Sequence, residues 1–178
     1  DDINRVLYSV PGVNIREEDG FGLRPNIGFR GATPERSKKI TVMEDGVLIG
    51  PAPYSAPAAY YFPMMNKMTA IEVFKGPAAI KYGPNTVAGT LNMATRHIPE
   101  GSEGQFDFSV GSDGYIKSKA YYGNTKGKFG YLLEGVHIES TGFKELDGGG
   151  DTGFDKNDVM AKVNYDLSTA DFSQILEL

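Results

Sequence analysis

The sequence predicts a small α+β domain in residues 1–98, with a mixed sheet and short helices, followed by antiparallel β-strands in residues 99–178. Two observations support this fold class. The 178 residues include 23 glycines, ten tyrosines and ten phenylalanines but neither tryptophan nor cysteine, a composition typical of strands and turns. After Pro99 the mixed pattern gives way to short apolar–polar alternations separated by turns.

The first domain begins with a helix and continues with short strands. Apolar residues at positions 3, 6, 7 and 10 have helical spacing, and Pro11-Gly12 ends the helix. Asp45-Gly46 separates two apolar runs and predicts a hairpin turn. We expect strands at residues 13–15, 27–30, 40–43, 47–49, 71–74 and 90–94, and one helical turn at residues 77–80.

The sequence predicts a loop at residues 50–63, a segment that contains four prolines and three tyrosines. Proline at this density excludes a central strand or a regular helix, and it stiffens the loop so that the aromatic rings point outward. The sequence therefore predicts a contact surface here.

The second region alternates most clearly in two segments. Phe106, Phe108 and Val110 share one face of the first segment. In the second, one face carries Val159, Ala161, Val163, Tyr165 and Leu167. Further strands are expected at residues 115–123, 128–140 and 172–178, with a long loop at residues 141–155. The alternation fits a transmembrane barrel, and a soluble β-sandwich would show nearly the same pattern.

Composition and motifs exclude several classes of function. The net charge of −5 includes no large basic patch, so we expect no nucleic-acid partner. His97 and His137 are the only histidines, and the chain has neither an HExxH helix nor a Gly-x-Ser-x-Gly elbow. Without cysteine there is no thiolate nucleophile or metal ligand. We therefore do not expect an enzyme.

Five motifs occur in order along the first hundred residues: Pro11-Gly12-Val13, Ile27-Gly28-Phe29-Arg30-Gly31, Val42-Met43-Glu44-Asp45-Gly46-Val47, Ile71-Glu72-Val73-Phe74-Lys75-Gly76-Pro77, and Tyr82-Gly83-Pro84 with Gly89-Thr90-Leu91-Asn92-Met93. In this order and spacing they resemble the plug domain of TonB-dependent outer-membrane receptors. The resemblance implies that residues 1–98 fill a transmembrane β-barrel of about 22 strands. Residues 99–178 would supply roughly the first five of these strands.

The resemblance also implies a function and partners. A receptor of this family sits in the outer membrane of a Gram-negative bacterium and takes up a ferric chelate into the periplasm. It contacts outer-membrane lipid and draws energy from the TonB–ExbB–ExbD complex through an N-terminal box, which we expect to lie outside this chain. It needs no cofactor or metal site of its own, because iron arrives within the transported chelate.

Two cations match positions that lock plug to barrel in this family. Arg30 and Lys75 each follow a strand and precede a glycine, and the resemblance implies that they face glutamates on the barrel wall. Lys75 stands where arginine is more usual. Because lysine presents a point charge instead of a planar fork, bidentate pairing is lost there.

The ligand candidates come from a closer resemblance, to the ferric dicitrate receptors. It rests on residues 52–57, 81–84 and 95–99, although Ala56 replaces a glutamine of that subfamily and cannot bind citrate through a hydrogen bond. Anionic chelates require cationic or hydroxyl donors. The candidate donors on the apical loops are Arg24, Arg36, Lys38, Tyr54, Ser55, Tyr60 and Tyr61.

Two other interpretations remain open at this stage. The acidic, glycine-rich residues 147–158 include Asp151, Asp155 and Asp158, which could bind calcium or form a solvated outer loop. The whole chain could instead be a secreted or periplasmic β-rich binding module, in which the tyrosine loop stacks against carbohydrate.

Overall fold

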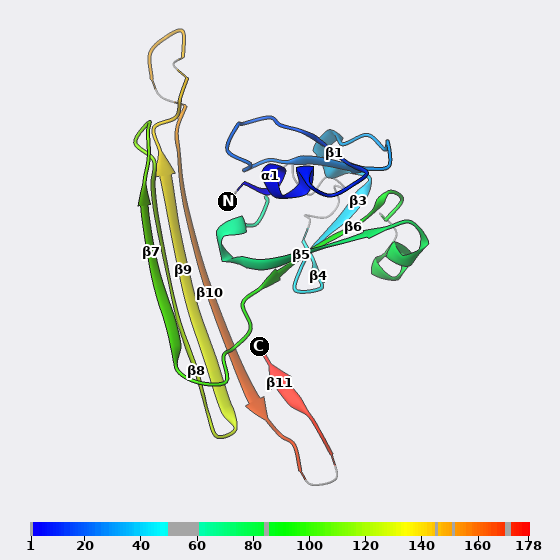
Figure 1. Cartoon of the computed structure of the whole chain (residues 1–178), viewed down its shortest axis with the longest axis vertical. Helices are drawn as coiled ribbons and strands as arrows, with labels where there is room; N and C mark the ends of the chain where they lie inside the picture. The colour runs from blue at the N-terminus through cyan, green and yellow to red at the C-terminus, as the bar shows by residue number, and fades with distance from the viewer. Residues whose placement is uncertain (1, 50–60, 84–85, 145, 151, 170–171) are drawn as a thin grey trace. The chain divides into compact units, whose positions relative to one another are not determined.

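The chain folds into two compact units, Asp1–Arg96 and His97–Leu178. The computed structural model describes residues 2–49, 61–83, 86–144, 146–150, 152–169 and 172–178 (Figure 1). No helix among these residues is long and apolar enough to cross a membrane.

The first unit combines a short helix with two separate sheets. The helix α1 (Ile3–Tyr8) precedes a two-stranded antiparallel ribbon of β1 (Val13–Arg16) and β2 (Asn26–Phe29). The second sheet has the order β4-β3-β6-β5, in which β3 and β6 are parallel and the other pairs are antiparallel. Its strands are β3 (Ile40–Glu44), β4 (Val47–Leu48), β5 (Met68–Lys75) and β6 (Gly89–Thr95), and the 3-10 turns are η1 (Glu35–Ser37), η3 (Met65–Lys67) and η4 (Pro77–Tyr82). The predicted mixed sheet with short helices is confirmed.

The core of this unit lies between α1, the ribbon and the four-stranded sheet. The helix contributes Ile3 and Leu7, which share one face because they are four residues apart. Asp2 caps its start by accepting a hydrogen bond of 2.8 Å from the backbone N–H of Asn4. The other fully buried members of the cluster include Ile27, Phe29, Ile40, Val42, Leu91 and Met93.

The turn at Asp45-Gly46 connects β3 to β4 and also fixes the end of β6. Asp45 and Gly46 both have positive φ angles, 48° and 80°. The Asp45 carboxylate accepts hydrogen bonds from the Thr95 backbone N–H at 2.8 Å and from the Thr95 hydroxyl at 2.5 Å. The Gly46 N–H donates to the Asn92 side chain at 2.9 Å. The predicted hairpin turn is confirmed, and it also holds the last residue of β6 in place.

A largely buried ion pair joins the end of β3 to the end of η3, just before β5. The Lys67 ammonium lies 2.8 Å from a Glu44 carboxylate oxygen, and the two side chains are 7% and 20% exposed. Nothing in the sequence pattern predicts this pair, because its members are separated by the proline-rich loop.

The second unit is a five-stranded antiparallel sheet with the strand order β11-β10-β9-β8-β7. The strands are β7 (Glu103–Val110), β8 (Ile116–Lys126), β9 (Phe129–Ser140), β10 (Phe154–Asp166) and β11 (Ile175–Glu177). They follow one another as a meander, each paired with its neighbour along the chain. This arrangement is the expected partial barrel.

One strand is longer than its sequence pattern indicates. The expected apolar alternation begins at Val159, but β10 begins at Phe154 and pairs with β9 from its first residue, Phe154 opposite Ser140. The early part carries Asp155 and Asn157 on the face that Val159 continues, so its polarity resembles that of a loop. Backbone pairing with β9 is what extends the strand.

Candidate functional site

Arg30 and Lys75 both lie beside the Pro11-Gly12 turn. The Arg30 backbone N–H donates to the Gly12 carbonyl at 2.8 Å, and the Lys75 ammonium donates to the Pro11 carbonyl at 2.5 Å. The Arg30 guanidinium also lies against Gly76, where an added Cβ would be 3.0 Å from Nη1. The structure therefore brings together two cations that lie far apart in the sequence.

These two cations share a short strip of surface without a counter-charge nearby. Among the residues that the structure describes, no carboxylate is within ion-pair distance of either group. Arg30 has a positive φ of 51°, which is uncommon for a residue other than glycine, asparagine or aspartate. Two like charges in this geometry favour an anionic partner.

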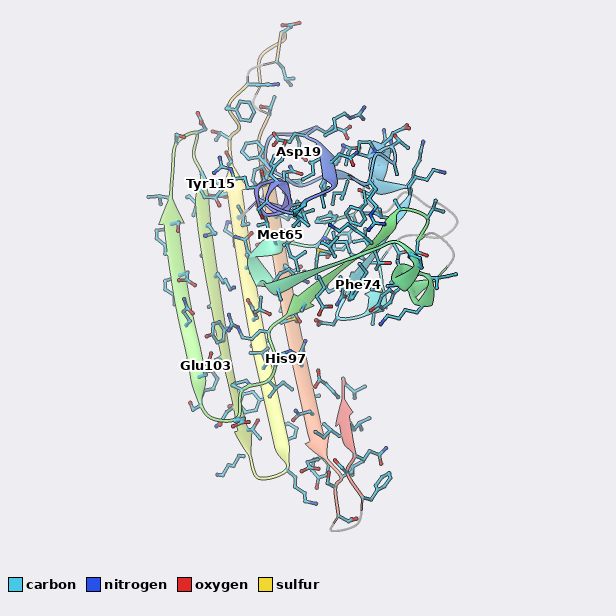
Figure 2. The ribbon with its side chains drawn as sticks, turned by 45° about the vertical axis from the view of Figure 1, so that its right-hand side comes forward. Asp19, Met65, Phe74, His97, Glu103 and Tyr115 are labelled. Atoms are coloured by element: carbon cyan, nitrogen blue, oxygen red, sulfur yellow. The ribbon has the colours of Figure 1, made fainter. Side chains whose placement is uncertain are left out.

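The other cations of the predicted ligand surface flank the far end of the β1–β2 ribbon. Arg24 precedes β2, and its backbone N–H donates to the Asp19 carboxylate at 2.7 Å. Asp19 also accepts from Phe21 at 2.8 Å and from Leu23 at 3.3 Å, so this carboxylate organises the whole loop. Figure 2 labels Asp19 in the loop before β2. The guanidinium of Arg24 is exposed.

Arg36 and Lys38 differ in how much of their charge is available. The Arg36 backbone N–H donates to the Asn26 side chain at 2.7 Å, and its own side chain is exposed. Lys38 instead pairs with Glu35 at 2.6 Å. The hydrogen bond from Lys38 lowers the pKa of the Glu35 carboxyl below its ordinary value. Arg36 therefore offers more free positive charge than Lys38.

Of the loop predicted at residues 50–63, only residues 61–63 are among the described residues. Tyr54, Ser55 and Tyr60 lie outside the described residues, and Tyr61 is 50% exposed.

An aromatic cluster that the sequence pattern did not predict lies on β5 and η4. The Lys81 ammonium is 4.6 Å from the ring centroid of Tyr82, which is 5.0 Å from the ring of Phe74. Figure 2 labels Phe74 on β5. The adjacent Lys81-Tyr82 pair is the only signal for it in the sequence.

In the second unit, one face of the sheet is apolar and exposed. It carries Phe106 and Phe108 on β7, Leu133 on β9, and Val159 and Val163 on β10. The opposite face mixes polar side chains with the buried Leu132, Val136 and Ile138. It includes an ion pair of 3.1 Å between Lys119 and the buried Glu134. Exposed apolar side chains alternating with polar ones are the pattern of a barrel that faces lipid outward.

The apolar band crosses the strands obliquely. Val110 on β7 is level with Glu139 on β9 and Asp155 on β10, through Ile116 on β8. Apolar positions on β7 and β8 are thus level with polar positions on β9 and β10. At the other end of the sheet the order is reversed, because the aromatic Tyr165 on β10 and Phe129 on β9 are level with the polar Lys126 on β8. Strands that cross a membrane at a tilt of about 35–45° produce such a displacement from strand to strand. This favours the barrel over the soluble sandwich.

Aromatic side chains gather at the lower end of the band, near the Gly127 turn. The ring centroids of Tyr122 and Tyr131 are 6.1 Å apart, and those of Phe129 and Tyr131 are 6.2 Å apart. Aromatic rings of this kind form girdles at the interface between the apolar band and water.

The calcium interpretation gains no support from the geometry. Within the described part of the chain, no group of three or more histidine, aspartate or glutamate side chains is arranged to hold a metal ion. Asp151 lies outside the described residues. Asp155 points instead toward His137, whose Nδ1 is 3.7 Å from Oδ1 of Asp155.

Comparison with known proteins agrees with this architecture. The profile of the TonB-dependent Receptor Plug Domain matches residues 1–90. The vitamin B12 transporter BtuB of Photobacterium profundum is 30% identical over 165 residues, which cover 90% of this chain and 26% of the transporter. The chain thus spans about a quarter of the length of this relative.

Solved structures show the same fold over nearly the whole chain. The ferric yersiniabactin uptake receptor FyuA from Yersinia pestis superimposes with a TM-score of 0.71 at 20% identity, covering 90% of this chain and 26% of the receptor. The siderophore receptor PirA from Acinetobacter baumannii gives 0.65 at 21% identity, covering 94% and 27%. The match over residues 1–90 takes in both the ribbon and the four-stranded sheet. The chain therefore belongs to the TonB-dependent receptor plug domain family.

Proposed function

We propose that this chain is the plug and the first barrel strands of an outer-membrane receptor of a Gram-negative bacterium, which takes up a ferric chelate into the periplasm. One observation carries the proposal: a plug-family domain in residues 1–90 is followed directly by a sheet with an oblique apolar band. The plug closes the barrel and presents part of the ligand surface. The domain boundary falls near residue 98, and residues 99–178 form the first five strands of the barrel.

The charge of the loops supports an anionic cargo. Arg24 and Arg36 expose guanidinium groups on the loops beside β2, and guanidinium groups pair well with carboxylate or catecholate oxygens. Tyr54, Ser55, Tyr60 and Tyr61 add hydroxyl donors. Lys38 contributes less, because Glu35 neutralises it. Ferric citrate and ferric siderophores both fit this chemistry, and ferric citrate is the more specific cargo that we propose.

Uptake by the whole receptor tests the function. Deletion of the gene should abolish active accumulation of one labelled cargo among ferric citrate, a ferric catecholate, a ferric hydroxamate and cobalamin. In the parent strain a protonophore should stop uptake of that cargo, because it collapses the proton gradient from which the TonB–ExbB–ExbD complex draws energy. If the deletion abolishes only the uptake of cobalamin, the cargo is a corrinoid and not a ferric chelate. If the deletion leaves the uptake of all four cargoes unchanged, the receptor function is refuted.

The plug–barrel lock gives a second test in the same strain. We expect Arg30→Ala with Lys75→Ala to loosen the plug, since both cations would lose their carboxylate partners on the barrel wall. A loss of about 1.4 kcal/mol already raises the population of displaced plug about tenfold. Sensitivity to a large antibiotic that porins exclude should rise accordingly.

A matched double variant controls for charge alone. Arg5→Ala with Lys39→Ala also removes two exposed cations from the first unit, but neither lies beside the Pro11-Gly12 turn. It should leave sensitivity unchanged. If both double variants admit the antibiotic equally, Arg30 and Lys75 are ordinary surface cations and the lock is wrong.

A further inference from the structure

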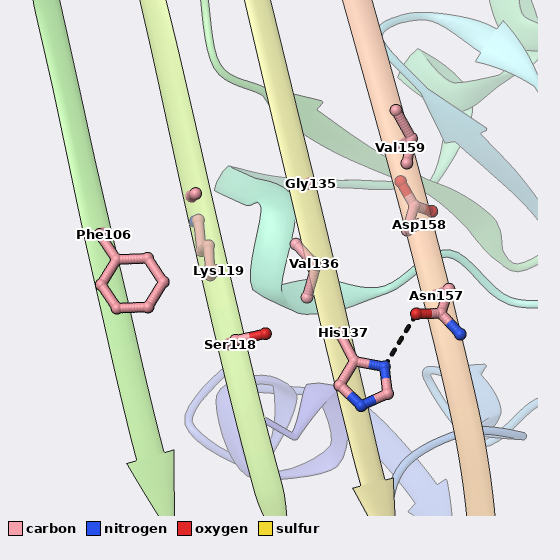
Figure 3. A pocket seen from close by; sticks show the side chains of 10 residues that line it. Phe106, Ser118, Lys119, Gly135, Val136, His137, Asn157, Asp158 and Val159 are labelled. Atoms are coloured by element: carbon pink, nitrogen blue, oxygen red, sulfur yellow. Dashed lines mark hydrogen bonds between the residues drawn. The ribbon is translucent and has the colours of Figure 1, made fainter.

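The apolar face of the second unit contains a notch of about 260 Å³ (Figure 3). Ala120 on β8 and Gly135 on β9 are directly paired and form its floor. Phe106 on β7 and Val159 on β10 form its two walls and are 70% and 78% exposed. Figure 3 shows the walls on either side of Gly135.

The notch exists because Gly135 has no side chain, although the backbone at this position does not require glycine. Gly135 has no left-handed φ, and a Cβ added there would meet no heavy atom within 4 Å. A β-branched or large apolar residue would fit and would favour the strand, whereas glycine inside a strand costs about 0.5–1 kcal/mol. The neighbouring positions on the same face of β9 are large, Leu133 and Tyr131.

The polar rim of the notch marks the edge of the apolar band that lies toward the end of β9 and the start of β10. His137 and Asn157 are paired across the two strands, and His137 Nδ1 is 2.8 Å from Asn157 Oδ1. Beyond them the same face carries Glu139 and Asp155. Ser118 on β8, opposite His137, lies at the same end, and Lys119 and Asp158 line the notch from positions whose side chains alternate to the other face. On this face the notch is therefore apolar at its floor and walls and polar at the His137 end, the arrangement that matches a lipid with its chain in the band and its polar group at the edge.

We propose that this notch is a binding site for one acyl chain of a membrane lipid, whose polar group lies at the His137–Asn157 pair. The proposal rests on the proposed function, because it requires the apolar band to face the bilayer. Next to the notch the paired positions of β8 and β9 carry larger side chains, Tyr122 opposite Leu133. In the notch an acyl chain contacts Phe106, Val159 and the exposed strand backbone at once, so a single lipid is held longer than its neighbours.

Native mass spectrometry of the whole receptor tests the site. The receptor is purified in detergent with dimyristoylphosphatidylcholine as the probe, and retained lipid is counted. Gly135→Leu fills the notch without a backbone conflict, and Ala120→Leu fills it from the adjacent strand. Each should lower retention of the most firmly held lipid about tenfold, as expected when about two methylene groups lose their apolar contact.

Ala161→Leu is the matched control, because Ala161 lies on the same face of the band, opposite Leu133, but does not line the notch. It should retain lipid as the parent receptor does. Equal retention by all four proteins, or no retained lipid in the parent, would overturn the site. Membrane fractionation and uptake are measured on the same strains. If the parent receptor reaches the membrane and transports cargo but Gly135→Leu retains as much lipid as the parent, only the notch is refuted. If the parent receptor is absent from the membrane fraction, the proposed function is refuted.

Discussion

Replacing Gly89 with alanine is expected to destabilise the first unit by about 3–5 kcal/mol. Gly89 begins β6 with a φ of 149°, and a Cβ there would lie 2.4 Å from the Phe74 carbonyl oxygen and 2.6 Å from the Phe29 ring. One of these atoms is backbone in the paired strand β5, and the other belongs to a fully buried side chain. Neither can move without opening the sheet or the core.

Hydrogen exchange at the amides of β5 and β6 measures this effect in the purified protein. Both strands should exchange much faster in Gly89→Ala than in the parent. Gly46→Ala separates backbone strain from the clash, because Gly46 has a φ of 80° but open space around its Cβ position, and it should cost only about 1 kcal/mol. Equal protection in the two variants would show that the close approach at Gly89 is not limiting.

Replacing Lys67 with methionine is the second change with a large expected effect. It would leave the half-buried Glu44 carboxylate without the ammonium that lies 2.8 Å away. Breaking a buried pair costs about 3–5 kcal/mol, and the 20% exposure of Glu44 places the loss near the lower end of that range. Chemical denaturation measures this loss of stability, and hydrogen exchange at the amides of β3 and β5 locates it.

Two further variants test whether the charge pair is responsible. Glu44→Leu combined with Lys67→Met should recover most of the stability, since an apolar pair of similar volume replaces the buried ions. Lys38→Met removes a similar lysine–glutamate contact on the surface, where Lys38 and Glu35 are 39% and 50% exposed, and should leave the stability unchanged within error. A double variant as unstable as Lys67→Met would mean that the lysine acts through its packing and not through Glu44.

The sequence predicted features whose causes are local. The helix at Ile3, the turn at Asp45-Gly46 and the alternation from Val159 each depend on residues within a few positions of one another. Arg30 and Lys75 were found because each lies in a motif of the family. Their shared contact with Pro11-Gly12 was not predictable, because it depends on how β2 and β5 end in space.

The features that sequence reasoning missed depend on long-range packing. The partnership of Lys67 with Glu44 and of Asp45 with Thr95 requires knowledge of which strands pair, and strand pairing joins residues far apart in the chain. The notch at Gly135 was missed for another reason. A glycine in an alternating strand usually indicates a bulge or a close backbone approach, whereas here it leaves empty space.

The separation of the two sheets in the first unit has a mechanical consequence. The ribbon of β1 and β2 forms its own ladder and shares none with the four-stranded sheet. Tension applied at the N-terminus would first have to draw α1, with its buried Ile3 and Leu7, out of the core. It would then reach Val13, opposite Phe29 at the end of the ribbon's ladder, and would open the hydrogen bonds of that ladder one after another. The parallel pair of β3 and β6, anchored where Asp45 holds Thr95, would be stretched only later. The helix, the ribbon and the four-stranded sheet would thus yield in stages.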